Sequence, residues 1–290
     1  MSDEDKMIPA QISKAVRQLN SIRPGYESLL DLYEKIFVAQ EKSKMVTKVP
    51  AVDIPEETLK KKVSEKFPLA NLSDFTVDVD SAAALLEEIC GSLRGSGNDY
   101  SEAAGLVLDA ISRGALDYAG LYSAFLGENE HYFDKASESI GVDKSGLAFF
   151  IYNSAKPSLV LFAETISRYL DPNTEWLKGY CPICGSPAAL SLFEKDGKRF
   201  LCCSFCWHKW PTRRIFCNNC ENADDKTLKY YSFDNEQEHR VDVCDKCKSY
   251  IKTVDCRNAD RFIYPPLEYI STPHIDIKMM EMGFTSCVRS

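Results

Sequence analysis

Eight cysteines between residues 181 and 247 have the type and spacing that metal chemistry needs. They form four pairs in which two residues separate the two thiols, namely Cys181/Cys184, Cys203/Cys206, Cys217/Cys220 and Cys244/Cys247. Such a pair can curl around one ion, because the short turn between the cysteines brings both sulfurs to one side. Two pairs complete a tetrahedron with metal–sulfur bonds of about 2.3 Å for zinc. The four pairs therefore predict two metal sites with four cysteine ligands each.

The order of the pairs indicates which thiols share an ion. Eighteen residues separate Cys184 from Cys203, and 23 separate Cys220 from Cys244. Both spacings are close to that of a usual two-knuckle site. Both intervals are typical of a β-hairpin, over 188–203 with an Asp196-Gly197 turn and over 227–244 with a longer acidic turn. Consecutive pairing gives each hairpin its own ion and is the predicted scheme. An interleaved cross-brace, with the first pair joined to the third, is the alternative.

The other cysteines are predicted not to be ligands. Cys202 precedes Cys203 directly, and because neighbouring side chains of a strand point to opposite faces, only Cys203 can serve the second pair. Cys256 and Cys287 have no partner at ligand spacing, and Cys90 is expected to be a small core residue.

Other uses of the pairs are less favourable. Covalent haem attachment requires a histidine directly after the second cysteine, and the residues there are Gly185, Trp207, Glu221 and Lys248. A thioredoxin-like redox pair requires a βαβ setting, which the pattern does not indicate. An iron–sulfur cluster is chemically possible with four thiolates, but the spacing suits a single ion better.

The ligand set also limits the chemistry of the ion. Four thiolates accept iron or zinc. They leave no open coordination position for a substrate or a water, so we expect the ions to be structural and to perform no catalysis.

The acidic beginning of the chain, residues 1–10, lacks the basic and apolar segments of a secretory signal, so we expect a cytoplasmic protein. Thiols stay reduced in that compartment, which favours metal ligation over disulfides. The most apolar stretch, 147–166, is interrupted by Asn153, Lys156 and Pro157. We interpret it as buried core helix and expect no membrane span.

The first 177 residues are predicted to form a bundle of about six to eight helices. Apolar side chains recur at three- and four-residue spacing in 23–44, 80–93 begins at Asp80 as its expected cap, and 98–114 ends at Gly114. Further helices are expected over 116–126, 130–139 and 143–169. No residue of this half indicates chemistry, and its single histidine, His131, is more typical of a surface or capping group.

The predicted fold class is therefore α+β. An α-helical domain over 1–177 precedes a metal module over 178–215 and a second one over 216–257, and a C-terminal extension over 258–290 packs on the modules. Net charge follows the same division, with −10 over 1–177 and +3 over 178–257.

The residues of the metal region are similar to those of a known family. The segments "CPICGSPA" (181–188), "CSFCWHKWPTRRIFCNNC" (203–220) and "CDKCKSYIK" (244–252) together resemble the formate dehydrogenase accessory proteins of the FdhE type. The likeness continues through 258–284, and the helical half agrees in size and character. Trp207 and Glu221 stand where a knuckle glycine is expected.

The resemblance implies a helical N-terminal domain followed by two rubredoxin-like modules, each holding one iron ion through four cysteines, with zinc as the alternative metal. It implies a non-catalytic, chaperone-like accessory factor for the assembly and maturation of formate dehydrogenase, which contacts the catalytic subunit of that enzyme. Trp207, Trp210 and Arg214 are candidate contact residues, because Trp and Arg supply much of the energy of protein interfaces.

Two functions of other classes stay open. A zinc-ribbon protein that binds nucleic acid would use Arg213, Arg214 and the aromatic Phe205 and Trp207, but the positive excess is small and acidic segments interrupt it, so no nucleic acid is expected. A rubredoxin-like electron carrier would need reversible iron chemistry and leaves the large helical half unexplained.

Overall fold

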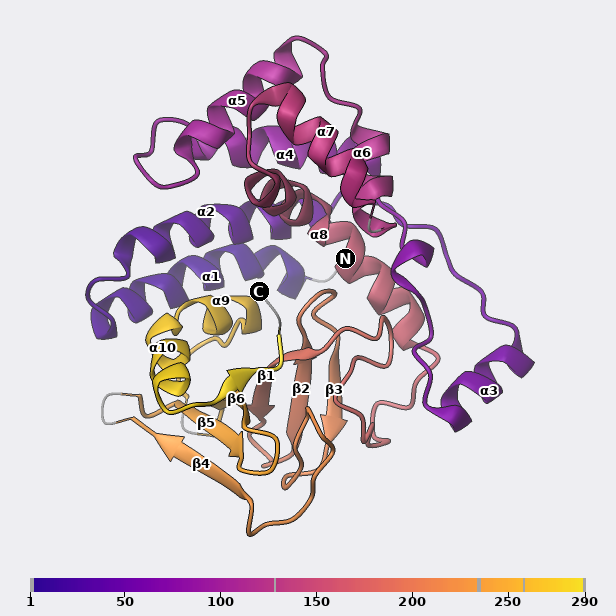
Figure 1. Ribbon diagram of the computed structural model, residues 1–290, viewed down its shortest axis with the longest axis vertical. Coiled ribbons are helices and arrows are strands. Elements are labelled where there is room, and N and C mark those ends of the chain that lie inside the picture. The colour runs from indigo at the N-terminus through magenta and orange to yellow at the C-terminus, as the bar shows by residue number, and fades with distance from the viewer. Residues whose placement is uncertain (1–2, 128, 234–235, 258, 289–290) are drawn as a thin grey trace. The chain divides into compact units, whose positions relative to one another are not determined.

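The structure, a computed structural model, describes residues 3–127, 129–233, 236–257 and 259–288. The chain divides into two compact units (Figure 1). The helical unit comprises Met1–Ala51 and Leu72–Phe162, and the sheet unit comprises Val52–Asn71 and Ala163–Ser290.

Helices form the helical unit, as the sequence predicts. They are α1 (Asp3–Ile22), α2 (Glu27–Lys44), the short 3₁₀ helix η1 (Leu72–Asp74), α4 (Val79–Leu93), α5 (Ser101–Ser112), α6 (Tyr118–Leu126), α7 (Glu130–Ile140) and most of α8 (Lys144–Ser167). The cap predicted for α4 is wrong by two residues. Asp78, not Asp80, accepts a hydrogen bond from the backbone N–H of Ser81 at 3.3 Å, because a residue before the first turn is needed to reach that donor.

Pro157 lies inside α8, which is continuous from Lys144 to Ser167. A proline has no backbone N–H, so the carbonyl of Asn153, one turn earlier, loses its helical partner. The buried Gln40 of α2 supplies the missing donor, because its Nε2 lies 2.9 Å from that carbonyl oxygen. A side chain from another helix thus permits the proline without a break in the helix.

Among the described residues, α8 is the one helix whose length and apolar composition suffice to cross a membrane, and 72% of its apolar window is buried inside the structure.

The sheet unit contains one sheet that joins both predicted hairpins. Its strands are β1 (Ala188–Phe193), β2 (Arg199–Cys203), β3 (Lys209–Thr212), β4 (Leu228–Ser232), β5 (His239–Cys244), β6 (Ser249–Asp255) and β7 (Thr285–Ser286). Their order is β3-β2-β1-β6-β5-β4, and β7 pairs with β6. Within each module the pairing is antiparallel, whereas β1 and β6 pair in parallel, with Leu190 opposite Lys252. The two modules are therefore halves of a single sheet.

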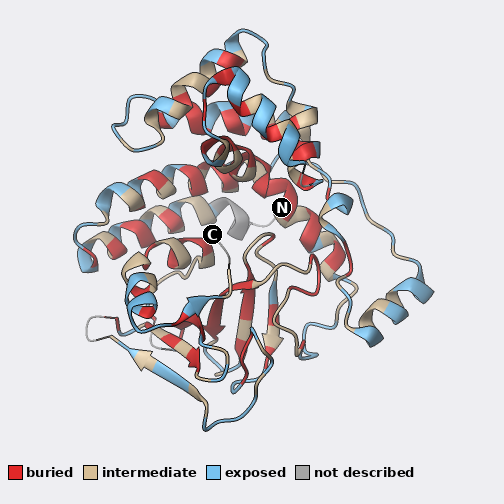
Figure 2. Cartoon of the chain, in the orientation of Figure 1, coloured by how far each residue is buried: buried red, intermediate tan, exposed pale blue. Residues whose placement is uncertain are grey.

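The two faces of the sheet differ because alternate residues of each strand point to opposite sides. On one face, Val241 and Val243 of β5 pack with Ile275 and Met279 of α10 (Pro273–Glu281), which follows α9 (Pro265–Ile270). On the other face, Asp242 of β5 lies between these two valines in sequence and pairs with arginines. Figure 2 shows the central strands in red and the edge strand β4 in tan and blue.

One further helix, α3 (Glu56–Glu65), belongs to the sheet unit together with the segment that follows it, up to Asn71. The predicted four-part division at 177, 215 and 257 stays a prediction. The two compact units divide the chain at other positions. Residues 52–71 and 163–177 group with the sheet, because hydrogen bonds attach them to the first module.

Candidate metal centres

The eight predicted ligands gather in two clusters. One contains Cys181, Cys184, Cys203 and Cys206, and the other contains Cys217, Cys220, Cys244 and Cys247, with all sulfurs of a cluster within 4.8 Å of one another. These are the groups of the consecutive scheme, and the interleaved cross-brace is not formed. We name them centre 1 and centre 2.

The spacing of the sulfurs fits a tetrahedral ion. Metal–sulfur bonds of about 2.3 Å place neighbouring sulfurs of a tetrahedron about 3.8 Å apart, whereas a disulfide needs about 2.0 Å. In centre 1 the Sγ atoms of Cys181 and Cys206 are 3.7 Å apart. In centre 2 those of Cys220 and Cys244 are 3.8 Å apart. Both clusters can hold one ion without rearrangement of the ligands.

The turns between paired cysteines point backbone N–H groups at the sulfurs. The N–H of Ile183 donates to Cys181 Sγ at 3.4 Å, that of Phe205 to Cys203 Sγ at 3.3 Å, and that of Asn219 to Cys217 Sγ at 3.4 Å. Such bonds favour the thiolate over the thiol, so these turns are suited to charged ligands.

The residue after the second cysteine of every pair has a left-handed backbone. These residues are Gly185 (φ 78°), Trp207 (φ 57°), Glu221 (φ 58°) and Lys248 (φ 55°). Glycine adopts this conformation without a steric penalty, whereas other residues lose about 1–2 kcal/mol. The knuckle geometry is thus kept at Trp207 and Glu221, where glycine was expected, and the same strain occurs at Lys248.

Centre 1 is buried on all four ligands, because a segment that is distant in the sequence covers it. The backbone N–H groups of Leu69 and Ala70 donate to the carbonyls of Pro182 and Ile183 at 2.9 and 2.8 Å. Tyr180 Oη donates to the carbonyl of Lys66 at 2.7 Å. We name residues 66–70 the strap. It excludes water from one side of the first knuckle.

Centre 2 is more open, because Cys220 and Cys247 are only half-buried. Polar side chains surround its sulfurs instead. The hydroxyl of Ser249 lies 3.0 Å from Cys247 Sγ and 3.6 Å from Cys217 Sγ. Asn222 Nδ2 donates to Cys244 Sγ at 3.7 Å. Sequence spacing does not reveal these contacts, since they depend on how the second hairpin folds against its knuckles.

Burial raises the pKa of the clustered thiols, whereas hydrogen bonds to Cys184 and Cys247 lower it. Burial raises the pKa of Cys181 and Cys206 above the ordinary value, whereas hydrogen bonds from three neighbouring thiols lower the pKa of Cys184. At centre 2, burial raises the pKa of Cys247, but the Ser249 hydroxyl and other donors outweigh it and bring the pKa to about 6. An ion binding at centre 1 therefore has to displace protons from buried thiols.

The cysteines that were predicted not to be ligands lie outside both clusters. Cys202 and Cys256 are buried with Leu190 and Val254. Burial raises the pKa of Cys202 to about 12, which keeps it a neutral packed thiol. Cys90 is fully buried in α4.

The candidate contact residues have different environments. Trp210 is 1% exposed and packs in the core of the sheet unit, so it cannot touch a partner. Trp207 is half-buried and meets Tyr269 edge to face, with ring centres 6.2 Å apart. Arg214 is exposed, and its guanidinium lies 5.5 Å from the centre of the Phe193 ring. Of the three, Arg214 is the most accessible.

A buried ion network ties the C-terminal segment to β5. Arg261 pairs with Glu238 at 2.6 Å and with Glu268 at 2.5 Å, and His239 Nε2 lies 3.0 Å from Glu268. Burial raises the pKa of Glu268, but Arg261 and His239 outweigh it and bring the pKa to about 2. Arg261 therefore helps to hold a buried carboxylate in its charged form.

The fold and the two clusters define a class of protein. It combines a helical unit with a duplicated, ribbon-like module in which two pairs of cysteines and a hairpin form a closed four-thiolate centre. An ion held by all four thiolates of such a centre would have no ligand position left for a substrate.

Comparisons with known proteins show similarity to one family. Residues 180–214 match the family model described as "FdhE, central domain". A "Protein FdhE homolog" of Aquifex aeolicus is 34% identical over 154 residues, which are 52% of this chain and 53% of the relative. "Protein FdhE" of Salmonella paratyphi A is 32% identical over 109 residues, 36% of this chain and 34% of the relative. These matches confirm the predicted resemblance, and the chain is related to the FdhE family.

The aligned region spans about half, or less, of these curated relatives. A solved structure extends the likeness at the level of the fold. The crystal structure of the FdhE protein from Pseudomonas aeruginosa superimposes with a TM-score of 0.70 at 20% identity, covering 98% of this chain and 94% of that one. The mixed helical and sheet fold is thereby confirmed.

Proposed function

We propose that this chain is a non-catalytic cytoplasmic accessory factor for the maturation of formate dehydrogenase and that it binds the catalytic subunit of that enzyme. The observation that carries the proposal is the presence of two closed four-cysteine centres on one sheet in a chain related to the FdhE family. Closed centres support a binding role, because a metal with four thiolates presents no free position to a substrate.

The eight cysteines of centres 1 and 2 are proposed as the ligands of two mononuclear ions, iron in the first instance and zinc as the alternative. The sulfur spacing suits either metal, since both accept tetrahedral thiolate ligands. When bound, the ion supplies folding energy to its module. The chain's own contribution is to hold the sulfurs at tetrahedral spacing and to point N–H groups at them.

Affinity purification tests the client. The tagged chain is purified under anaerobic conditions from its own cells, and the co-purifying proteins are identified by mass spectrometry against an untagged control. We expect enrichment of a formate dehydrogenase catalytic subunit. Recovery of nucleic acid or transcription proteins in its place contradicts the proposal and favours a nucleic-acid-binding ribbon.

A matched pair of baits shows whether the metal modules contribute to the interaction. Cys181→Ser removes a ligand of centre 1, whereas Cys90→Ser changes a buried thiol of the helical unit far from any ligand in the sequence. We expect the first variant to lose the client and the second to keep it. Equal recovery with both baits contradicts a role for the metal modules in binding.

The metal itself is identified by elemental analysis of the same preparation and by its absorption. Tetrathiolate iron absorbs visible light through charge transfer from sulfur, whereas zinc does not, because its d shell is full. We expect two ions per chain and visible absorption that bleaches when the iron is removed. A colourless protein with two zinc ions per chain supports the alternative metal and leaves the structural role unchanged.

A further inference from the structure

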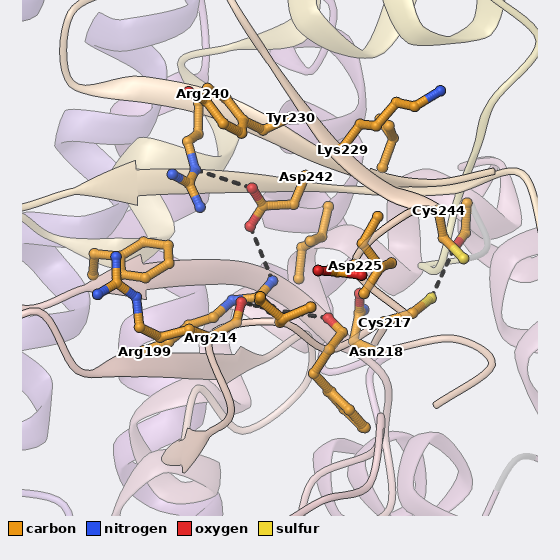
Figure 3. Close-up of a pocket in the computed structure, with 17 residues that line it drawn as sticks. Arg199, Arg214, Cys217, Asn218, Asp225, Lys229, Tyr230, Arg240, Asp242 and Cys244 are labelled. Atoms are coloured by element: carbon orange, nitrogen blue, oxygen red, sulfur yellow. Dashed lines mark hydrogen bonds and ion pairs between the residues drawn. The ribbon is translucent and has the colours of Figure 1, made fainter. Parts of the chain in front are cut away.

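A second candidate site lies in the sheet unit, on the face of the sheet opposite α10. It is a pocket of about 400 Å³ between strands β4 and β5 and the segment 214–218, which joins the two modules (Figure 3). Its walls combine apolar side chains with charged ones. Neither the metal centres nor the proposed function accounts for it.

The floor of the pocket is a buried arginine whose Nε, Nη1 and Nη2 atoms all donate to groups of the protein. Arg199 is 2% exposed, and it donates to Ser191 Oγ at 2.9 Å, to the carbonyl of Phe216 at 2.9 Å and to Asp242 at 3.0 Å. It also reaches the carbonyl of Arg214 at 3.3 Å. Arg199 therefore fixes the segment 214–218 to the sheet and gives the pocket its shape.

Arg240 forms one wall and is held by aromatic rings. Its guanidinium lies 4.5 Å from the centre of the Phe193 ring and 4.8 Å from that of Tyr230. Its Nε lies 3.0 Å from a carboxylate oxygen of Asp242. Figure 3 marks this ion pair with a dashed line. Packing between two rings orders the guanidinium plane and removes water from its faces, which lowers the cost of binding an anion at its edge.

Arg214 faces the same aromatic ring and has no acidic partner within the described part of the chain. Its guanidinium lies 5.5 Å from the centre of Phe193. The adjacent Arg213 differs, because it pairs with Glu175 at 3.6 Å and does not line the pocket. Two arginines that line the pocket, Arg214 and Arg240, therefore contact the same ring. Of these two, Arg214 is the one without an acidic partner among the described residues.

The charge of the lining indicates the charge of the ligand. Four cationic and two acidic side chains line the pocket, namely Arg199, Arg214, Lys229, Arg240, Asp225 and Asp242. Lys229 is neutralised from outside by Asp245 at 2.6 Å. Among these six side chains, the thiolates of centre 2 left aside, one positive charge then remains in excess.

The position of centre 2 also disfavours highly charged anions. Cys217 and Cys244 line the pocket, and Figure 3 shows them at the end opposite Arg240. Four thiolates around a divalent ion carry a formal charge of −2, so a phosphate dianion would meet repulsion there as well as from Asp225. A planar carboxylate, which fits the edge of a guanidinium through two parallel hydrogen bonds, carries only one charge.

We propose that this pocket binds the carboxylate group of a ligand that also has an apolar part. The carboxylate pairs with Arg214 and Arg240, and the apolar part packs against Ile215 and Tyr230, whose side chains are 51% and 61% exposed at the pocket. The carboxylate belongs either to a small organic acid or to an acidic side chain of a peptide. The proposal does not depend on the proposed function.

Isothermal titration calorimetry of the metal-loaded full chain tests the proposal with paired probes. The small acid is 3-phenylpropionate, with its neutral amide as the control. The peptide is N-acetyl-Phe-Glu-Leu-amide, with glutamine in place of glutamate as the control. We expect at least one carboxylate probe to bind, and its neutral counterpart to bind about tenfold more weakly or not at all. The tighter of the two acidic probes identifies the source of the carboxylate.

Adjacent arginines provide a matched pair of variants. Arg214→Gln is expected to weaken binding about tenfold or more, and Arg214→Lys to weaken it less, because lysine keeps the charge but lacks the planar fork. Arg213→Gln is expected to change binding less than about twofold, since that side chain does not line the pocket. Metal content and thermal unfolding of each variant establish that the fold is kept.

Three results overturn the proposal. They are equal binding of a probe and its neutral counterpart, equal loss in Arg213→Gln and Arg214→Gln, and no binding of either carboxylate probe at concentrations up to about 10 mM. Tighter binding of inorganic phosphate than of both carboxylates would replace the ligand class with a phosphate.

Discussion

Centres 1 and 2 have the same ligands, the same knuckle turn and a hairpin of the same kind, yet they differ in what covers them. Centre 1 is enclosed by the strap, residues 66–70, whose backbone bonds to the first knuckle. Centre 2 leaves Cys220 and Cys247 half-exposed and relies on polar neighbours such as Ser249. A repeated sequence motif thus specifies the grouping of the four thiols, whereas access of solvent to the sulfurs depends on chain segments outside the motif.

The difference matters because access controls exchange. A buried tetrathiolate loses its ion only after local unfolding, whereas an exposed one can be attacked directly by a competing ligand or an oxidant. We therefore expect centre 1 to be the stable element of the sheet unit and centre 2 the labile one. The predictions below test that contrast.

Removal of a ligand should have the largest effect. Cys181→Ser leaves an incomplete tetrahedron, and the binding energy of a structural ion, about 10–16 kcal/mol in small zinc modules, is largely the folding energy of its module. We expect the metal content to fall from two ions per chain to one and the first module to unfold, as measured by elemental analysis and circular dichroism. Cys244→Ser should do the same to the second module. Two retained ions in either variant contradict the ligand assignment.

Truncation of a buried side chain in the strap should have a smaller but still large effect on the stability of the sheet unit. Leu69 is 4% exposed in the strap, so Leu69→Ala is expected to destabilise the sheet unit by about 2–5 kcal/mol and to speed the loss of the ion from centre 1 alone. Phe67→Ala is the matched control, because Phe67 is 53% exposed in the same segment. Stopped-flow chelation separates the two ions. Equal effects of the two variants would remove the strap from the explanation.

Chelation of the wild-type chain should proceed in two steps. Centre 2 is expected to lose its ion at least about tenfold faster than centre 1, since its half-exposed sulfurs can be reached without local unfolding. A coloured thiol-competing chelator, followed by mass spectrometry of the intact metalloprotein, should reveal a species with one ion. Loss of both ions in one step contradicts independent centres.

The smallest predicted effect concerns the left-handed residues after the knuckles. Gly185→Ala introduces a strained backbone at centre 1, and its added methyl group would lie 3.1 Å from Pro68 of the strap, so we expect a loss of about 1–2 kcal/mol. Lys248→Gly removes the same strain at centre 2 and should change the stability by less than about 1 kcal/mol, because the flexibility of glycine in the unfolded chain offsets the relief. Thermal unfolding of both variants measures the contrast.

The sequence was informative wherever a local rule decides the outcome. The grouping of eight thiols follows from two-residue spacing and from hairpins bounded by turn residues, and the exclusion of Cys202 follows from strand alternation. The cap of α4 was missed by two residues, because Asp78 and Asp80 both suit a cap and only the backbone decides between them.

Long-range contacts could not be predicted from those rules. The strap bonds residues that are more than a hundred positions apart, and nothing in its composition refers to a cysteine knuckle. The same holds for Gln40, which supplies the donor that Pro157 lacks, and for Arg214 and Arg240, which line the pocket and both contact Phe193. Each of these is a contact between side chains or backbones that only the folded arrangement brings together.

Because β1 and β6 pair in parallel, the two modules have the same orientation in the sheet. Each module contributes three strands in the same order, so the third strand of the second module, β6, joins the first strand of the first module, β1. The modules are thus related as successive steps along a line and not as partners across a two-fold axis. Because β4 is the counterpart of β1, the outer edge of β4 corresponds to the edge of β1 that pairs with β6. At the other end of the sheet, β3 is short and contains Pro211. Proline and a short strand discourage further pairing at that end, so any extension of the sheet would proceed from β4 only.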